Sequence, residues 1–189
     1  EAENAPLASG TYWLKNVASG KFITAGESWG TCAVFGEHGL DFDFIAQEDG
    51  TYTIDSKLSN GGDRHFFGAE GWMDAAATKW NVVKMPGGAY SISVDGANFL
   101  GYDASNVWNA QTKVSVNLTD NTAEAAQWII LSKEKMIASL ENATVGNPVD
   151  ATFFISAPNF GRNDTRFSTA WQGGPIRGGA NDNMCAEVW

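Results

Sequence analysis

The sequence contains no long hydrophobic run and has little positive charge. No stretch of about 18 apolar residues occurs among its 189 residues, so we expect no membrane insertion. Its 12 Lys and Arg residues stand against 22 Asp and Glu residues, which gives a formal net charge of −10. Proteins that bind nucleic acid or anionic membrane surfaces use basic patches, so we expect neither kind of partner.

Cysteine is scarce as well. Cys32 and Cys185 are far apart in the sequence and fit neither a metal clip nor a disulfide framework, so we expect buried thiols.

The first ten residues, EAENAPLASG, lack the charged and apolar regions of a signal peptide. We therefore expect a mature N-terminus, or an artificial start, with any signal peptide already removed.

The signatures of common enzymes and of cofactor sites are missing. The two histidines, His38 and His65, have no metal-ligand companion at a suitable spacing, and the sequence has no His-Glu-x-x-His motif. It also has no Gly-x-Ser-x-Gly motif, no Walker loop and no dinucleotide fingerprint. We therefore expect a protein that is not an enzyme and that has no metal and no cofactor.

A short sequence motif, Gly-x-Tyr-x-aliphatic, occurs three times. Its copies begin at Gly10, Gly50 and Gly88. Each copy is followed by an aromatic-aliphatic or aromatic pair, then by an acid and a tryptophan, and then by a closing apolar strand. The starts are 40 and 38 residues apart, and a period of this size indicates a repeat architecture.

The local pattern predicts four short β-strands in each unit. TYTI and YSISV alternate apolar and polar residues, as half-buried strands do. EDG, SNGGD, MPGG and DGAN between them are typical of turns. Propellers use about four to eight four-stranded blades, so three units are too few. Three such units closing on themselves predict an all-β fold, a β-trefoil over residues 10–133.

The closing strands resemble those of ricin-type β-trefoil lectins and their bacterial relatives. The segments Trp80-Asn81-Val82 and Gln127-Trp128-Ile129 are similar to the Gln-x-Trp strand of that family, while Phe44 replaces the tryptophan in the first unit. This resemblance implies a carbohydrate-binding, lectin-like protein that is secreted, periplasmic or on the cell surface. Trp80 and Trp128 are expected to lie in the core.

The residues after position 133 have a different character. Residues 133–143 place Met136, Ile137 and Leu140 on one side of a short amphipathic helix, and residues 134–148 are predicted to be a connector. Residues 149–189 resemble the opening of a galactose-binding-like β-sandwich, which follows other domains in secreted bacterial glycan-handling proteins. A complete sandwich needs about 100 residues. Either the chain is a fragment of a multidomain protein, which we favour, or this tail packs against the trefoil. Residues 1–9 are expected to form an N-terminal tail.

The acid and the tryptophan of each unit are the candidate ligand-binding residues. An indole offers a flat platform for the C–H face of a sugar ring, and a carboxylate accepts hydrogen bonds from sugar hydroxyls. The candidates are Glu27 and Trp29, Glu70 and Trp72, and Asp103 and Trp108. Alternatively, the tryptophans are core residues and the acids cap turns. The spacing between acid and tryptophan is two residues in the first two units and five in the third.

Three functional hypotheses remain open. The first is a non-catalytic carbohydrate-binding module with a glycan partner, which predicts exposed tryptophans beside carboxylates. The second is a protein-interaction or scaffold trefoil without a sugar site, in which the three tryptophans would be buried. The third is an accessory part of a glycan-degrading enzyme whose catalytic domain is absent from this chain.

Overall fold

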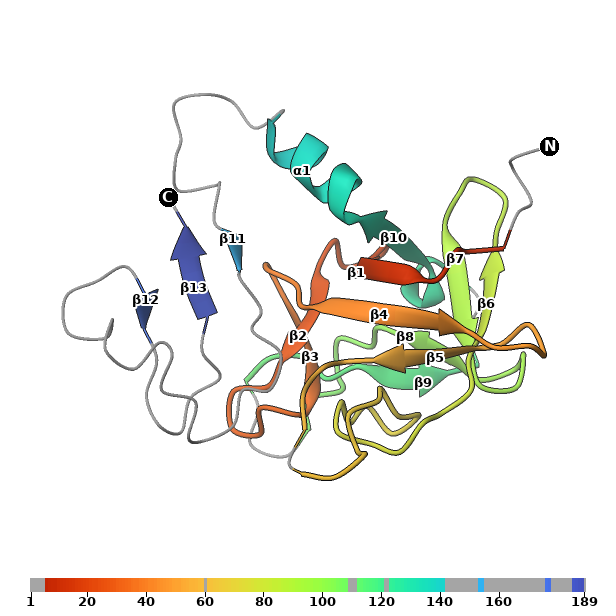
Figure 1. Ribbon diagram of the computed structural model, residues 1–189, viewed down its shortest axis with the longest axis horizontal. Coiled ribbons are helices and arrows are strands. Elements are labelled where there is room, and N and C mark those ends of the chain that lie inside the picture. Colours follow the sequence, from red (N-terminus) through yellow and green to blue (C-terminus); the bar gives the residue numbers. More distant parts are fainter. Residues whose placement is uncertain are drawn as a thin grey trace.

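Nearly all regular structure in the protein is β. The structure is a computed structural model (Figure 1) that describes residues 6–59, 61–108, 112–120, 123–141, 153–154, 176–177 and 185–188. One sheet of ten strands contains β1 (Gly10–Asn16), β2 (Phe22–Ala25), β3 (Ala33–Gly36), β4 (Asp41–Ala46), β5 (Tyr52–Asp55), β6 (Asn81–Lys84), β7 (Tyr90–Ser93), β8 (Phe99–Gly101), β9 (Asn117–Thr119) and β10 (Trp128–Ser132). A 3₁₀ turn, η2 (Glu124–Ala126), precedes β10.

Six of these strands close into a barrel. β1 pairs with β4, β4 with β5, β6 with β7, β7 with β10, and β10 with β1, all antiparallel. The remaining gap between β5 and β6 is closed by an isolated bridge between Tyr52 and Trp80. Figure 1 shows β1, β4 and β5 side by side on one side of this barrel. A closed barrel leaves none of the six strands as an open edge.

The other four strands of this sheet form two hairpins, in the first and third units. β2 pairs with β3 in the first unit, and β8 pairs with β9 in the third. In the second unit the corresponding positions are only isolated bridges, Asp55 with Phe66 and Phe66 with Ala75. The prediction of four strands therefore holds for the first and third units. The second hairpin, GAEGWMDAAA, is rich in Gly and Ala, which are depleted in strands.

The core repeats with the sequence. Its equivalent positions come from the Gly-x-Tyr strand, from the pair that follows it and from the closing strand, and all are at most 1% exposed. They are Leu14, Ile54 and Ile92; Ile23, Phe67 and Leu100; and Phe44, Trp80 and Trp128. The prediction that Trp80 and Trp128 are core residues is confirmed.

Each core tryptophan also satisfies a polar group. The Trp80 indole Nε1 donates to the carbonyl of Phe67 at 3.0 Å, and the Trp128 Nε1 donates to the carbonyl of Leu100 at 2.8 Å. Buried indole N–H groups are costly without a partner, so the same hydrogen bond at both repeats fixes the closing strand against its own hairpin. Phe44 occupies this position in the first unit and has no N–H to donate.

The helix α1 (Lys133–Glu141) follows β10 directly and packs against β1 and β10 (Figure 1). It begins where the sequence predicts a helix. Farther along, β13 (Cys185–Val188) pairs with β11 (Phe153–Phe154) and with β12 (Ile176–Arg177). Most of residues 149–189 lie outside the described residues, so the galactose-binding-like sandwich and the predicted domain limits stay predictions. Among the described residues, no helix is both long and apolar enough to cross a membrane.

Candidate functional site

Three loops, one from the hairpin of each unit, are joined to one another. We call them loop 1 (residues 26–32), loop 2 (residues 68–74) and loop 3 (residues 102–116). The amide of Ala33 donates to the carbonyl of Gly71 at 2.9 Å, and Met73 donates to Thr31 at 2.7 Å, which ties the first hairpin to loop 2. Val116 donates to Ala33 at 3.0 Å, which ties the first hairpin to loop 3. The predicted acids and tryptophans all lie in these loops.

The acid of the first unit connects loop 1 to loop 3. The Glu27 carboxylate accepts hydrogen bonds from the hydroxyl and the amide of Thr112, both at 2.7 Å, and from the amide of Lys113 at 3.3 Å. The hydroxyl bond from Thr112 is the main reason why the pKa of Glu27 lies below its usual value. Glu27 therefore holds two loops together.

The acid of the third unit closes a turn. The Asp103 carboxylate accepts hydrogen bonds from the hydroxyl of Ser105 at 2.7 Å and from its amide at 2.9 Å. Both bonds lower the pKa of Asp103, and the bond from the Ser105 hydroxyl has the larger effect. This is the turn-capping role that the sequence left open as an alternative.

Glu70, the acid of the second unit, differs from the other two. Its side chain is exposed and lines a pocket between loop 2 and loop 3. Within the part of the chain that the structure describes, its carboxylate accepts no hydrogen bond. It is therefore the candidate acid whose acceptor capacity is open to a ligand.

The tryptophans of the second and third units come together. The Trp72 and Trp108 rings meet edge to face, with centroids 5.0 Å apart and planes at 83°. Trp72 is half-buried, whereas Trp108 is 41% exposed. Trp29 is 52% exposed on the turn of loop 1, and it is not among the residues that line the pocket. The structure therefore combines the second and third candidate pairs and sets the first apart.

The pocket has a volume of about 370 Å³. That is at the lower end of the range for small-molecule sites. Trp108, Val116 and Leu118 supply apolar lining, and Asn106 and Asn117 supply polar groups beside Glu70. An aromatic face with a few polar groups is the usual composition of a small-ligand site.

Backbone contacts hold Trp108 at the pocket. The Ser115 amide donates to the carbonyl of Asn106 at 2.7 Å, and the Asn106 side chain donates to the carbonyl of Ser115 at 3.1 Å. The amide of Trp108 donates to the Ser115 hydroxyl at 3.3 Å. These bonds fix the backbone of Trp108, and its ring makes the edge-to-face contact with Trp72.

Gly71 allows loop 2 to approach loop 3. Its φ is +80°, a conformation that favours glycine, and a Cβ at this position would lie 2.8 Å from the carbonyl oxygen of Val116. A side chain here would push apart the two walls of the pocket. Sequence reasoning did not single out Gly71, because it reads as one of many turn glycines.

Cys32 also lines this pocket and is a free, buried thiol, as the sequence predicts. Burial raises the pKa of this thiol, so it stays protonated and unreactive at neutral pH. Among the described residues, no group of three or more His, Cys, Asp or Glu side chains could hold a metal ion.

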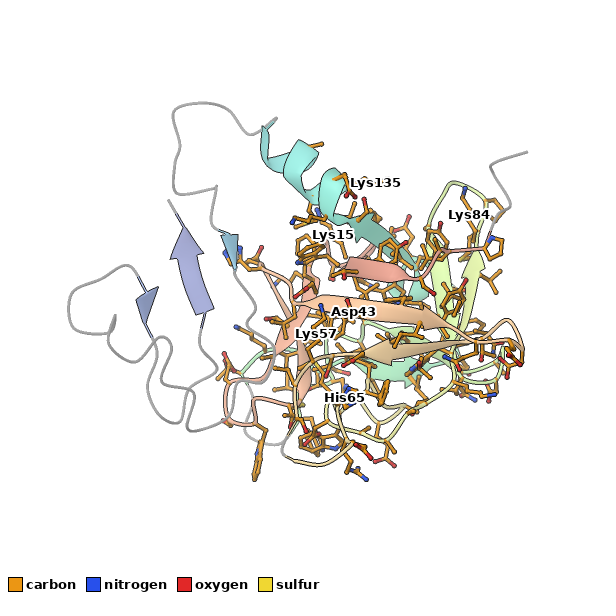
Figure 2. The ribbon with its side chains drawn as sticks, viewed as in Figure 1. Lys15, Asp43, Lys57, His65, Lys84 and Lys135 are labelled. Carbon is orange, nitrogen blue, oxygen red and sulfur yellow. The ribbon has the colours of Figure 1, made fainter. Side chains whose placement is uncertain are left out.

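A second polar cluster lies on the side of the barrel. The Nζ atom of Lys57 is 2.9 Å from Asp41 and 3.0 Å from Asp43, and Figure 2 shows Lys57 beside Asp43. The Nδ1 atom of His65 is 2.8 Å from Asp55, and its ring stacks on Phe66. Lys57 bridges two carboxylates and Asp55 contacts the His65 ring, so the groups of this cluster hold one another in place, which is a structural role.

The polar residues Asn106, Ser115 and Asn117 were missed by sequence reasoning. They have no counterpart in the repeated motif, because they belong to the longer hairpin of the third unit. The five-residue spacing between Asp103 and Trp108 was the signal that this hairpin differs.

No protein-family model matches the sequence, and no curated protein matches it. Among solved structures, the chain is similar to the Macrolepiota procera ricin B-like lectin in complex with lactose, with a TM-score of 0.50 and 18% identity over 67% of this chain and 98% of that one. Together with the closed barrel, the two strand hairpins and the bridged segment of the second unit, this match decides the fold. The chain is a β-trefoil.

Two further structures give lower scores. A mosquitocidal holotoxin has a TM-score of 0.46 and 16% identity over 66% of this chain and 17% of that one. SeviL bound to asialo-GM1 saccharide has a TM-score of 0.48 and 16% identity over 67% and 99%. At 18% identity the match to the ricin B-like lectin concerns the fold and not its specificity.

Proposed function

We propose that this trefoil is a non-catalytic carbohydrate-binding module whose glycan occupies the pocket between loop 2 and loop 3. The observation that carries the proposal is the exposed Trp108 ring, held in place beside the unengaged carboxylate of Glu70. In this arrangement the sugar ring stacks its C–H face on Trp108 and donates a hydroxyl to Glu70.

The pocket lining matches both the apolar ring face and the polar hydroxyls of a sugar. Val116, Leu118 and Trp108 match the apolar face of the ring, and the amides of Asn106 and Asn117 can donate to or accept from its hydroxyls. The volume of about 370 Å³ suits a mono- or disaccharide end of a glycan. A trefoil of similar fold is a ricin B-like lectin in complex with lactose, which supports carbohydrate binding at the level of the fold.

The exposure of the tryptophans supports this proposal over a scaffold without a sugar site. A scaffold would bury all three, whereas Trp29 and Trp108 are 52% and 41% exposed. The proposed site uses Trp108 as the platform and Trp72 as its support, with Glu70 in place of the three separate acid-tryptophan pairs. Trp29 lies outside it.

The same proposal includes the setting of the module. The module is secreted, periplasmic or on the cell surface, in a longer bacterial glycan-handling protein whose next domain begins with the galactose-binding-like segment at residues 149–189. The resemblance of the tail sequence supports this setting. Any chemistry on the glycan would then belong to another domain, including the case of an accessory part of a glycan-degrading enzyme.

A glycan array on the isolated chain tests the proposal. We expect the wild type to bind, Trp108→Ala to lose at least about tenfold in affinity, and Glu70→Gln to bind more weakly, because each removes one of the two main contacts. Trp29→Ala is the matched control, since it removes another exposed tryptophan, one that lies outside the pocket. A wild type that binds nothing on a broad array, or equal losses in Trp29→Ala and Trp108→Ala, would overturn the proposal.

A further inference from the structure

We infer that the pocket between loop 2 and loop 3 selects sugars by charge: it accepts uncharged and amino sugars and rejects sugars that carry a carboxylate or a sulfate. This inference rests on the proposed function. It adds a specificity, and it assigns Glu70 as the residue that sets it.

The charge of the pocket lining is the first step. Among the lining residues that the structure describes, Glu70 is the only charged side chain, and none is Lys, Arg or His. An anionic sugar would therefore meet a carboxylate and no compensating cation.

The surrounding loops have the same sign. Loops 1, 2 and 3 contain four acids, Glu27, Glu70, Asp74 and Asp103, and one base, Lys113. Lys113 lies next to Thr112 and donates its amide to Glu27, whose charge its side chain partly balances. The formal charge of the whole chain is −10, which adds a long-range repulsion that salt screens beyond about 8 Å.

Hydrogen-bond chemistry adds a second discrimination. An ionised carboxylate such as Glu70 only accepts hydrogen bonds. A sugar hydroxyl can donate to it, and a sugar ammonium donates with the extra strength of a charge-assisted bond. An ionised sugar carboxylate or sulfate has no proton to offer. The same residue therefore favours amino sugars, tolerates neutral ones and opposes acidic ones.

Matched triplets of glycosides test the inference. Each triplet holds a hexoside, its C6 uronic acid and its 2-amino-2-deoxy analogue, in the glucose, galactose and mannose series, presented on one array at fixed pH and salt. For the series that binds, we expect the acid to bind at least about tenfold more weakly than the neutral sugar, and the amino sugar to bind at least as well as the neutral one. Glu70→Gln should bring the acid and amino forms close to each other.

Glu48→Gln is the matched control. It makes the same change of net charge at an exposed residue in the turn between β4 and β5, away from the pocket. It should leave the ratio of acid to neutral binding unchanged, and a thermal melt checks that both variants fold.

The outcomes separate the inference from the function. If the neutral hexoside and its uronic acid bind equally strongly, the charge selectivity is overturned and the carbohydrate-binding function stays intact. Equal changes of the ratio in Glu70→Gln and Glu48→Gln would overturn the role of Glu70. No binding by any member of any triplet, together with a blank broad array, would overturn the function itself.

Discussion

At the scale of single residues, equivalent side chains in the repeats have different roles. Glu27 joins two loops, Asp103 caps a turn and Glu70 lines the pocket, although each acid comes after a copy of the same Gly-x-Tyr motif. The core positions behave oppositely, because Trp80 and Trp128 make the same hydrogen bond in their units. Core positions are constrained by the packing of the repeat, whereas loop residues respond to whichever loop lies beside them.

Trp80→Phe tests the core hydrogen bond. The substitution removes the Nε1 donor and leaves the buried carbonyl of Phe67 without this partner, in addition to creating a cavity. We expect a loss of about 2 to 4 kcal/mol in the free energy of unfolding, measured by urea denaturation. Trp128→Phe should cost a similar amount because its contact with Leu100 is equivalent. A loss below about 1 kcal/mol in both variants would show that the indole N–H contributes little.

At the scale of elements, the three hairpin loops form one connected structure. Backbone bonds join the first hairpin to loops 2 and 3, and Glu27 adds a side-chain link across 85 residues of sequence. The pocket exists because loop 2 and loop 3 approach each other closely at Gly71. The shape of the site therefore depends on contacts between units.

The Glu27 link predicts a pH dependence of stability. Its pKa in the folded protein lies below the unfolded value of 4.5, so its contribution is fully present above pH 4.5 and is lost as the pH falls through the folded pKa. We expect the wild type to have a higher Tm than Glu27→Gln at pH 7, with the difference shrinking below pH 4.5. The side chain is exposed, so the effect is modest. A Tm difference that stays constant between pH 7 and pH 3 would contradict this role.

The sequence predicted the elements better than the site. The Gly-x-Tyr motif and the spacing of the units predicted the trefoil, because each repeat unit carries its own core residues, such as Ile54 and Trp80. The second hairpin was predicted as strands but has only bridges, because its Gly and Ala residues favour loops. The contact between Trp72 and Trp108 could not be predicted, since it depends on how two loops from different units meet.

At the scale of the whole molecule, a threefold repeat carries an asymmetric surface. The barrel closes with equivalent strands from all three units, but the second hairpin lacks regular strands and the third has a longer loop. Loop 2 and loop 3 therefore enclose the pocket that contains Glu70 and Trp108. The repeat builds a stable scaffold, and its irregularities build the site.

We propose that the chain binds glycan at one site made from two repeats. Isothermal titration calorimetry of the whole chain with the strongest array ligand tests this stoichiometry. We expect one ligand per chain for the wild type and for Trp29→Ala, and binding weaker by at least about tenfold for Trp108→Ala. Three ligands per chain, or undiminished binding by Trp108→Ala, would contradict it.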